Sequence, residues 1–321
     1  MADLAKEQPA SAPNTVYLDD YRPTDFLVDN ITLRFELEPE ETRVFSRMLV
    51  RRNPAAEHSG GALELQGQDL TLVSLKLDDV SLTESAYSLT DSALVIDEVP
   101  DSATLEIETL INPSINTALE GLYISSGMFC TQCEAEGFRR ITYYPDRPDV
   151  MAKFHTTLVA DPQQYPVMLS NGNPVEQGVL EDGRHWVTWE DPFPKPSYLF
   201  ALVAGDLACK QDSFTTASGR EVDLRIYVEH ENIEKCDHAL ASLKQAMAWD
   251  EQTYGREYDL DIFMIVAVND FNMGAMENKG LNIFNASCVL ASPETATDAD
   301  YYNIHSIIGH EYFHNWSGNR V

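Results

Sequence analysis

The chain has 321 residues, of which 44% are hydrophobic and 10% aromatic, enough for one or two globular domains with a sizeable core. It carries 22 basic and 52 acidic residues, which give a formal net charge of −30. This balance argues against nucleic acid and against an anionic membrane surface as partners, and it is typical of a strongly solvated surface.

Residues 1–16 are predicted to form a polar N-terminal tail. They contain Ala and Pro but no apolar core, so they do not match a signal peptide. No stretch of the sequence approaches the roughly 20 apolar residues of a membrane span. The five cysteines, an odd number in a long chain, indicate a reducing compartment. We therefore expect a cytoplasmic protein, with Cys130 and Cys133 as buried thiols rather than as a metal site.

Residues 17–205 are predicted to form an antiparallel β domain, a sheet or a sandwich. Between Ile31 and Glu38, apolar and charged residues alternate with period two, as in a half-buried strand. Similar short segments recur at residues 63–65, 72–77, 93–96 and 104–110. Turn-forming clusters of Gly, Asp, Asn and Pro separate them. Many short strands at close spacing favour this class of domain, which we expect to end shortly after an apolar strand over residues 198–203.

Residues 206–321 are predicted to mix strands and helices. An alternating strand is expected over residues 222–228, and a helix over residues 232–254. The continuous apolar run over residues 261–268 indicates a strand that is buried on both faces. The residues from 281 to 290 are expected to form another such strand.

The last helix is the most informative element. It should begin near Thr297 and Asp298, where either side chain can cap it, and it should run through Trp316. Its apolar residues leave little polar face, so we expect the helix to be buried.

This helix contains the pattern H-E-x-x-H at His310, Glu311 and His314. At 3.6 residues per turn, the two imidazoles leave the same face and can meet on one ion. Glu311 points about 100° away, beside the ion, where a base can take a proton from a bound water molecule. The pattern is the zinc-peptidase signature: neutral imidazoles bind zinc, zinc acidifies water, and the carboxylate accepts the proton.

Two further motifs occur upstream. Residues 274–278 read G-A-M-E-N, and residues 131–134 read T-Q-C-E. Together with H-E-Y-F-H-N-W at residues 310–316, they resemble the gluzincin zinc aminopeptidases of the membrane-alanyl type, and most closely their bacterial aminopeptidase N branch. The resemblance spans nearly the whole chain, and three motifs in one order argue against coincidence.

The resemblance implies a saddle-like β domain followed by a thermolysin-like catalytic domain. It implies one Zn²⁺ ion held by His310 and His314, with Glu311 as the general base. It assigns the ammonium group of the substrate to Glu277, helped by Glu134 and Gln132 from the first domain. Fixed carboxylates suit that task because they must replace the water around a buried positive charge.

The resemblance also gives the rest of the G-A-M-E-N segment a role in substrate binding. The backbone of Gly274, Ala275, Met276 and Asn278 would pair with an extended peptide like an added strand. The small side chains of Gly274 and Ala275 suit such a close approach. Met273, directly before the motif, would line the pocket for the first substrate side chain, to which a flexible thioether can adapt. The expected partner is a peptide with a free N-terminus, bound by a monomer.

One part of the family pattern is missing. Catalytic zinc sites usually take three protein ligands and a water molecule, and the family's third ligand is a glutamate on the following helix, beyond Val321. The tyrosine that stabilises the oxyanion and the helical C-terminal domain would also follow. We therefore expect residues 206–321 to be an incomplete thermolysin-like catalytic domain that ends just after the zinc helix.

Three hypotheses remain open. The first is a zinc aminopeptidase that releases N-terminal amino acids, of which this chain is the N-terminal portion. The second is an inert fragment or interaction module that binds zinc poorly. The third is an epoxide-hydrolase-like relative. The sequence disfavours the third, because those relatives resemble G-G-M-E-N and T-Q-C-Q where this chain has Ala275 and Glu134.

Overall fold

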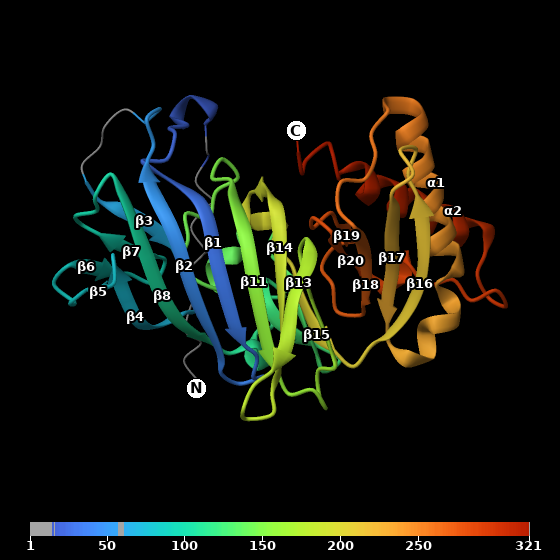
Figure 1. Cartoon of the computed structure of the whole chain (residues 1–321), viewed down its shortest axis with the longest axis horizontal. Helices are drawn as coiled ribbons and strands as arrows, with labels where there is room; N and C mark the ends of the chain where they lie inside the picture. The colour runs from blue at the N-terminus through green and yellow to red at the C-terminus, as the bar shows by residue number, and fades with distance from the viewer. Residues whose placement is uncertain (1–14, 16, 57–60, 321) are drawn as a thin grey trace, which may run out of the picture.

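The computed structural model describes residues 15, 17–56 and 61–320. Apart from residue 15, the tail predicted over residues 1–16 lies outside the described residues. Strands dominate the described chain, and the two long helices lie together at one side of the molecule (Figure 1). None of the described helices is long and apolar enough to cross a membrane.

The largest sheet has eight strands in the order β13-β14-β11-β1-β2-β8-β4-β5 (Figure 1). Its members are β1 (Phe26–Glu36), β2 (Thr42–Arg52), β4 (Thr71–Leu77), β5 (Val80–Ser81), β8 (Ser102–Ile111), β11 (Ala152–Ala160), β13 (Asn173–Val179) and β14 (His185–Lys195). β1 is antiparallel to β2 but parallel to β11, with Asn30 opposite Lys153. The sheet is therefore mixed rather than purely antiparallel. Parallel neighbours lie far apart in sequence, so a local alternation pattern cannot reveal them.

Two smaller sheets pack against one face of the large sheet, with which they share an apolar core. The first has the order β12-β15-β10-β9 and the second the order β3-β7-β6. Their members are β3 (Leu63–Gln66), β6 (Tyr87–Leu89), β7 (Ala93–Ile96), β9 (Gly121–Ser125), β10 (Met128–Gln132), β12 (Val167–Ser170) and β15 (Leu202–Gly205). The short 3-10 helices of this part are η1 (Leu18–Asp20), η2 (Pro113–Ile115), η3 (Phe138–Arg140) and η4 (Ser197–Leu199).

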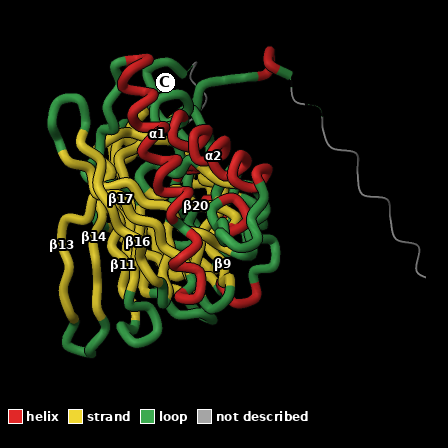
Figure 2. Tube along the Cα trace, turned by 90° about the vertical axis from the view of Figure 1, so that its right-hand side faces the viewer, coloured by secondary structure: helices red, strands yellow, loops and turns green. Residues whose placement is uncertain are grey.

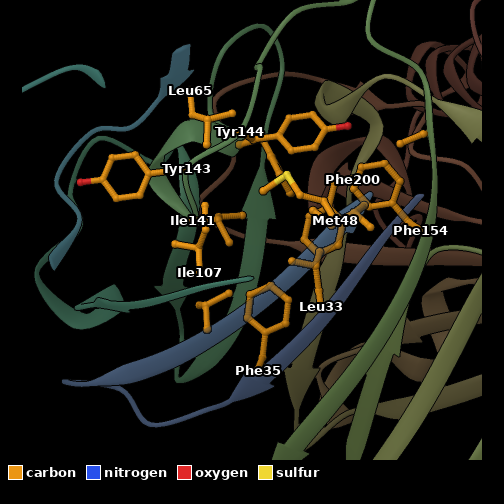
Figure 3. Packing of buried hydrophobic residues seen from close by; sticks show 14 of the residues in the cluster. Leu33, Phe35, Met48, Leu65, Ile107, Ile141, Tyr143, Tyr144, Phe154 and Phe200 are labelled. Atoms are coloured by element: carbon orange, nitrogen blue, oxygen red, sulfur yellow. The ribbon is translucent and has the colours of Figure 1, made fainter. Parts of the chain in front are cut away.

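An apolar core fills the space between these sheets. Figure 3 shows Leu33 and Phe35 of β1 beside Met48 of β2, with Phe154 and Phe200 close by. The strand expected over residues 198–203 begins late, at Leu202. Its first part is η4 instead, because the N–H groups of Leu199 and Phe200 bond back to the carbonyls of Pro196 and Ser197.

The fourth sheet has five strands in the order β16-β17-β18-β20-β19. Its members are β16 (Ala208–Thr215), β17 (Glu221–Val228), β18 (Ile262–Val268), β19 (Ala275–Met276) and β20 (Leu281–Asn285). All seven residues of β18 are buried, which confirms the strand predicted to be covered on both faces. β20 ends at Asn285 rather than near Leu290, since the 3-10 helix η6 (Ala286–Cys288) follows it at once.

Two α-helices cover one face of this sheet, and the four-stranded sheet covers the other. The 3-10 helix η5 (His230–Lys235) leads into α1 (Asp237–Tyr254), which packs beside α2 (Asp298–Phe313) (Figures 1 and 2). On the opposite face, Met264 and Ile283 share a core with Tyr123 and Leu199 of the first domain. The strands β17, β18 and β20 are therefore enclosed between helices and the first domain, whereas β16 has no buried residue.

The start of α2 was correctly predicted, but its end and its burial were not. Thr297 caps the helix in a capping box: its hydroxyl accepts from the Asp300 N–H, and the Asp300 carboxylate accepts from the Thr297 N–H. The helix ends at Phe313, and turns follow. One stripe of the helix, including Ile304 and Ile308, is buried, whereas Tyr302 is 76% exposed. Apolar residues on several sides thus do not mean burial on all sides.

Candidate metal and peptide-binding site

The two histidines predicted to bind metal meet at the C-terminal end of α2. The Nε2 atoms of His310 and His314 lie 3.1 Å apart. The Nδ1 of His314 donates to the Ser317 carbonyl at 2.7 Å, which selects the tautomer with a free lone pair on Nε2. The spacing of the two Nε2 atoms is compatible with two bonds of about 2.0–2.1 Å to one zinc ion. The residues present therefore fit the expected metal.

Glu311 lies on the buried side of the same helix. Its side chain is 6% exposed, and its carboxylate and the two imidazoles offer ligand atoms that all lie within 4.8 Å of one another. Burial raises the pKa of Glu311 to about 8, and the charges of Glu277 and Glu134 add to this shift. The position beside the histidine pair is the one that the helical spacing predicted.

Gln132 and Glu134 bring the first domain to the same place. Gln132 ends β10 and is 2% exposed; its Nε2 donates to the Glu134 carbonyl at 3.4 Å and lies 3.1 Å from the Met273 sulfur. Burial raises the pKa of Glu134, the charge of Glu277 raises it further, and His314 lowers it. The three carboxylates of Glu134, Glu277 and Glu311 are thus close enough to interact electrostatically. The Gln132 Oε1 atom is buried without a hydrogen-bond partner among the described residues.

The G-A-M-E-N segment forms the edge of the five-stranded sheet. Ala275 and Met276 make up β19, which pairs antiparallel with β20. The Gly274 carbonyl accepts from the Asn285 N–H at 2.9 Å. A Cβ atom at Gly274 would have the Cys288 sulfur as its nearest neighbour, at an ordinary contact distance of 3.8 Å. The chain's own packing does not require glycine here, so the residue leaves open space beside the strand.

The flanking residues divide between the site and its support. Met273 is 42% exposed at the rim, whereas Asn278 is 1% exposed and turned inward. The Asn278 side chain donates to the carbonyls of Leu199 and Phe200, at 3.3 and 3.4 Å. It therefore holds the segment against the first domain, and its side chain is not directed to the open edge of β19.

Three residues near the site were not predicted from the sequence: Tyr198, Lys279 and Asn319. Burial raises the pKa of Tyr198, and the charges of Glu277 and Glu134 add to the shift, which places its ring near both carboxylates. Asn319 donates to the Glu277 carbonyl at 3.0 Å, and Lys279 donates to the Asn315 side chain at 2.7 Å. Adjacency to the motifs is a sequence signal for Lys279 and Asn315, but nothing in the sequence marks their contact.

Comparison with known proteins matches both parts of the chain. Residues 33–199 match the peptidase M1 N-terminal domain, and residues 238–321 match the peptidase family M1 domain. The chain belongs to peptidase family M1. The family expected from the motifs is therefore confirmed, as is the mainly β domain followed by the start of an α+β catalytic domain.

The relatives of this M1 chain are considerably longer than the chain itself. It is 56% identical to aminopeptidase N of Escherichia coli strain K12 over 309 residues, which cover 96% of the chain and 35% of the relative. It is 52% identical to aminopeptidase N of Haemophilus influenzae over 308 residues, which cover 95% of the chain and 35% of the relative. Among solved structures, aminopeptidase A of Legionella pneumophila in complex with aspartic acid matches with a TM-score of 0.91 and 42% identity, over 94% of this chain and 36% of that one. The M1 chain thus spans about a third of the length of the curated relatives it matches.

Proposed function

We propose that this chain carries the metal-binding histidines and the N-terminus-binding carboxylates of a zinc aminopeptidase. The observation that carries the proposal is the grouping of Glu134, Glu277 and Glu311 beside the histidine pair. Three like charges in a half-buried space disfavour each other's ionisation unless cations offset them. A metal ion and the ammonium group of a peptide are two cations of the required kind, and the relatives are named aminopeptidases.

The residues divide the chemistry between them. His310 and His314 would hold the ion through their Nε2 atoms. A zinc ion bound there would polarise the scissile carbonyl and lower the pKa of a water molecule. Glu311 accepts the proton of the attacking water and delivers it to the leaving amine. Cations at the histidines and at Glu277 favour the ionised carboxylate of Glu311, which a base requires.

The selectivity for a peptide end comes from the other two carboxylates. Glu277 and Glu134 accept hydrogen bonds from the substrate ammonium, and the Gln132 Oε1 atom supplies a further acceptor. The outer edge of β19, from Gly274 to Met276, pairs with the backbone of the first substrate residues. Met273 lines the pocket for the first side chain. This arrangement recognises a free N-terminus with little demand on sequence.

The proposal is tested by zinc titration and by hydrolysis of aminoacyl anilides, first with this chain and then with a longer protein that contains it. We expect zinc to bind at one equivalent and to be lost in the paired variant His310→Ala with His314→Ala. We expect unblocked substrates to be cleaved in strong preference to N-acetylated ones. Equal zinc binding by the paired variant, or equal cleavage of blocked and unblocked substrates, would contradict the proposal.

A second candidate is a zinc-binding module without turnover. The described residues that can hold the metal are two imidazoles and Glu311, whereas catalytic zinc sites usually have three protein ligands besides the base. Zinc binding without hydrolysis, in this chain and in the longer protein alike, would favour this candidate. The monomeric state and the cytoplasmic location stay predictions.

A further inference from the structure

The peptide-binding segment and the metal-binding helix come from separate parts of the sequence, yet the proposed function requires a fixed distance between them. Two side-chain contacts join them through the turn that follows α2, residues 314–320. The Asn319 Nδ2 atom donates to the Glu277 carbonyl at 3.0 Å. The Lys279 Nζ atom donates to the Asn315 Oδ1 atom at 2.7 Å. Asn315 directly follows His314, so this second contact holds the residue next to a proposed metal ligand.

Lys279 is unusually placed for a lysine. It is 2% exposed, and its ammonium group also pairs with the Asp259 carboxylate. Arg320, at the end of the turn, pairs with the same carboxylate. The Lys279 ammonium lies 5.1 Å from the centre of the Phe193 ring and 5.6 Å from that of Tyr258. The charge is therefore removed from water, and its acceptors are the Asp259 carboxylate and the Asn315 side chain.

A buried ion pair is seldom kept for stability alone, because the loss of water around both charges offsets most of their attraction. Its better-attested benefit is to select one arrangement among several packings. Here both members of the ion pair contact the turn. The Asp259 carboxylate holds Lys279 and Arg320, and the Asn315 Nδ2 atom lies 3.4 Å from the same carboxylate.

We propose that Lys279 is a positioning residue: its ammonium group fixes Asn315, and with it the turn after the histidine pair, at a set distance from Glu277. The inference rests on the proposed function, since it concerns how the metal-binding and ammonium-binding parts of that site are kept in register. Methionine is neutral and one heavy atom shorter, so it fills most of the space but removes the donor to the Asn315 Oδ1 atom, and Asn315 is held less firmly. His314 then loses part of its orientation, because its Nδ1 bond to Ser317 lies within the same turn.

The test compares Lys279→Met with a matched control, Lys195→Met. Lys195 is 1% exposed, forms a 3.1 Å ion pair with Asp191 and lies 3.9 Å from the centre of the Phe154 ring. The two lysines thus share burial, pairing and an aromatic neighbour. Their charges influence each other, but Lys195 pairs with Asp191 on its own strand, whereas Lys279 donates to Asn315 in the turn. We expect both variants to be less stable, and only Lys279→Met to bind zinc about tenfold more weakly in a competition titration of the folded chain. Equal zinc affinity in the two variants would overturn the proposal.

A second measurement needs no metal. Hydrogen exchange should be about tenfold faster for the amides of residues 315–320 in Lys279→Met, and unchanged there in Lys195→Met. Unchanged exchange in Lys279→Met would overturn the positioning role of Lys279, whether or not the wild-type chain binds zinc. Failure of the wild-type chain to bind zinc would count only against the proposed function. If Lys279→Met does not fold, Asn315→Ala removes the acceptor and keeps the Lys279–Asp259 pair. Asn315→Ala is likewise expected to show weaker zinc binding and faster exchange in the turn. If neither changes, the proposal is overturned.

Discussion

Acidic side chains on the outer face of the eight-stranded sheet are paired with basic ones, whereas the acidic side chains beside α2 are grouped with one another. On the sheet, Arg47 and Lys76 stand opposite Glu106 on neighbouring strands, and their ion pairs measure 3.3 and 3.4 Å. Beside α2, three carboxylates share one space, and among the described residues none of them pairs with a lysine or arginine. The first pattern is cross-strand stabilisation. The second costs stability, and proteins keep such groupings where a ligand supplies the missing charge.

Among substitutions that test this contrast, Glu311→Ala is expected to have the largest effect, on kcat. In a longer protein that contains this chain and turns over, kcat should fall about 10²–10⁴-fold, because a positioned base is lost. The zinc content should stay unchanged, since both histidines remain. The check is kcat measured at equal zinc content, and an unchanged kcat would remove Glu311 from the role of base.

Glu277→Gln is expected to have the next largest effect. Hydrogen bonds to a charged group contribute about 1.5–3 kcal/mol, so kcat/KM for unblocked peptides should fall about 10–100-fold. N-acetylated peptides serve as the internal control, because they lack the ammonium. An equal loss on both kinds of peptide would show that Glu277 does not bind the N-terminus.

Glu134→Gln should improve stability while it impairs binding. Burial and Glu277 raise the pKa of Glu134, so its ionised form destabilises the fold at neutral pH, and this penalty disappears as the pH falls below the ordinary range for glutamate. Because the group is partly exposed, we expect a gain of at most about 1 kcal/mol in the free energy of unfolding at pH 7. Urea unfolding at pH 7 and at about pH 4 measures it. A loss of stability in Glu134→Gln at pH 7 would show that the ionised Glu134 carboxylate does not destabilise the fold.

Arg47→Ala should have the smallest effect. Its side chain is 61% exposed, so its pair with Glu106 contributes only about 0.5 kcal/mol, and the contribution should shrink in high salt. Zinc affinity should not change. A change of several kcal/mol in the free energy of unfolding would show that Arg47 contributes more than an exposed ion pair.

Local signals in the sequence predicted much of this molecule, and long-range contacts account for what they missed. The cap at Thr297, the buried strand of residues 262–268 and the meeting of His310 with His314 all depend on residues close together in sequence. The parallel pairing of β1 with β11 depends on distant segments, as does the contact of Lys279 with Asn315. The grouping of Glu134 with Glu277 came from resemblance, because no spacing rule connects residues of two domains.

Under the proposed function, the edge position of β19 affects which polypeptides the site would accept. Within the described residues β19 pairs with β20 alone, so its other side offers backbone groups only to a chain that is itself extended. Under the proposed function, a terminus already hydrogen-bonded in a helix or hairpin must first be released. Its apparent affinity is then the intrinsic affinity multiplied by the fraction of time that the terminus spends released. The strand would thereby discriminate by local order rather than by side chain, sparing the ends of well-folded proteins and exposing those of short or unstructured peptides.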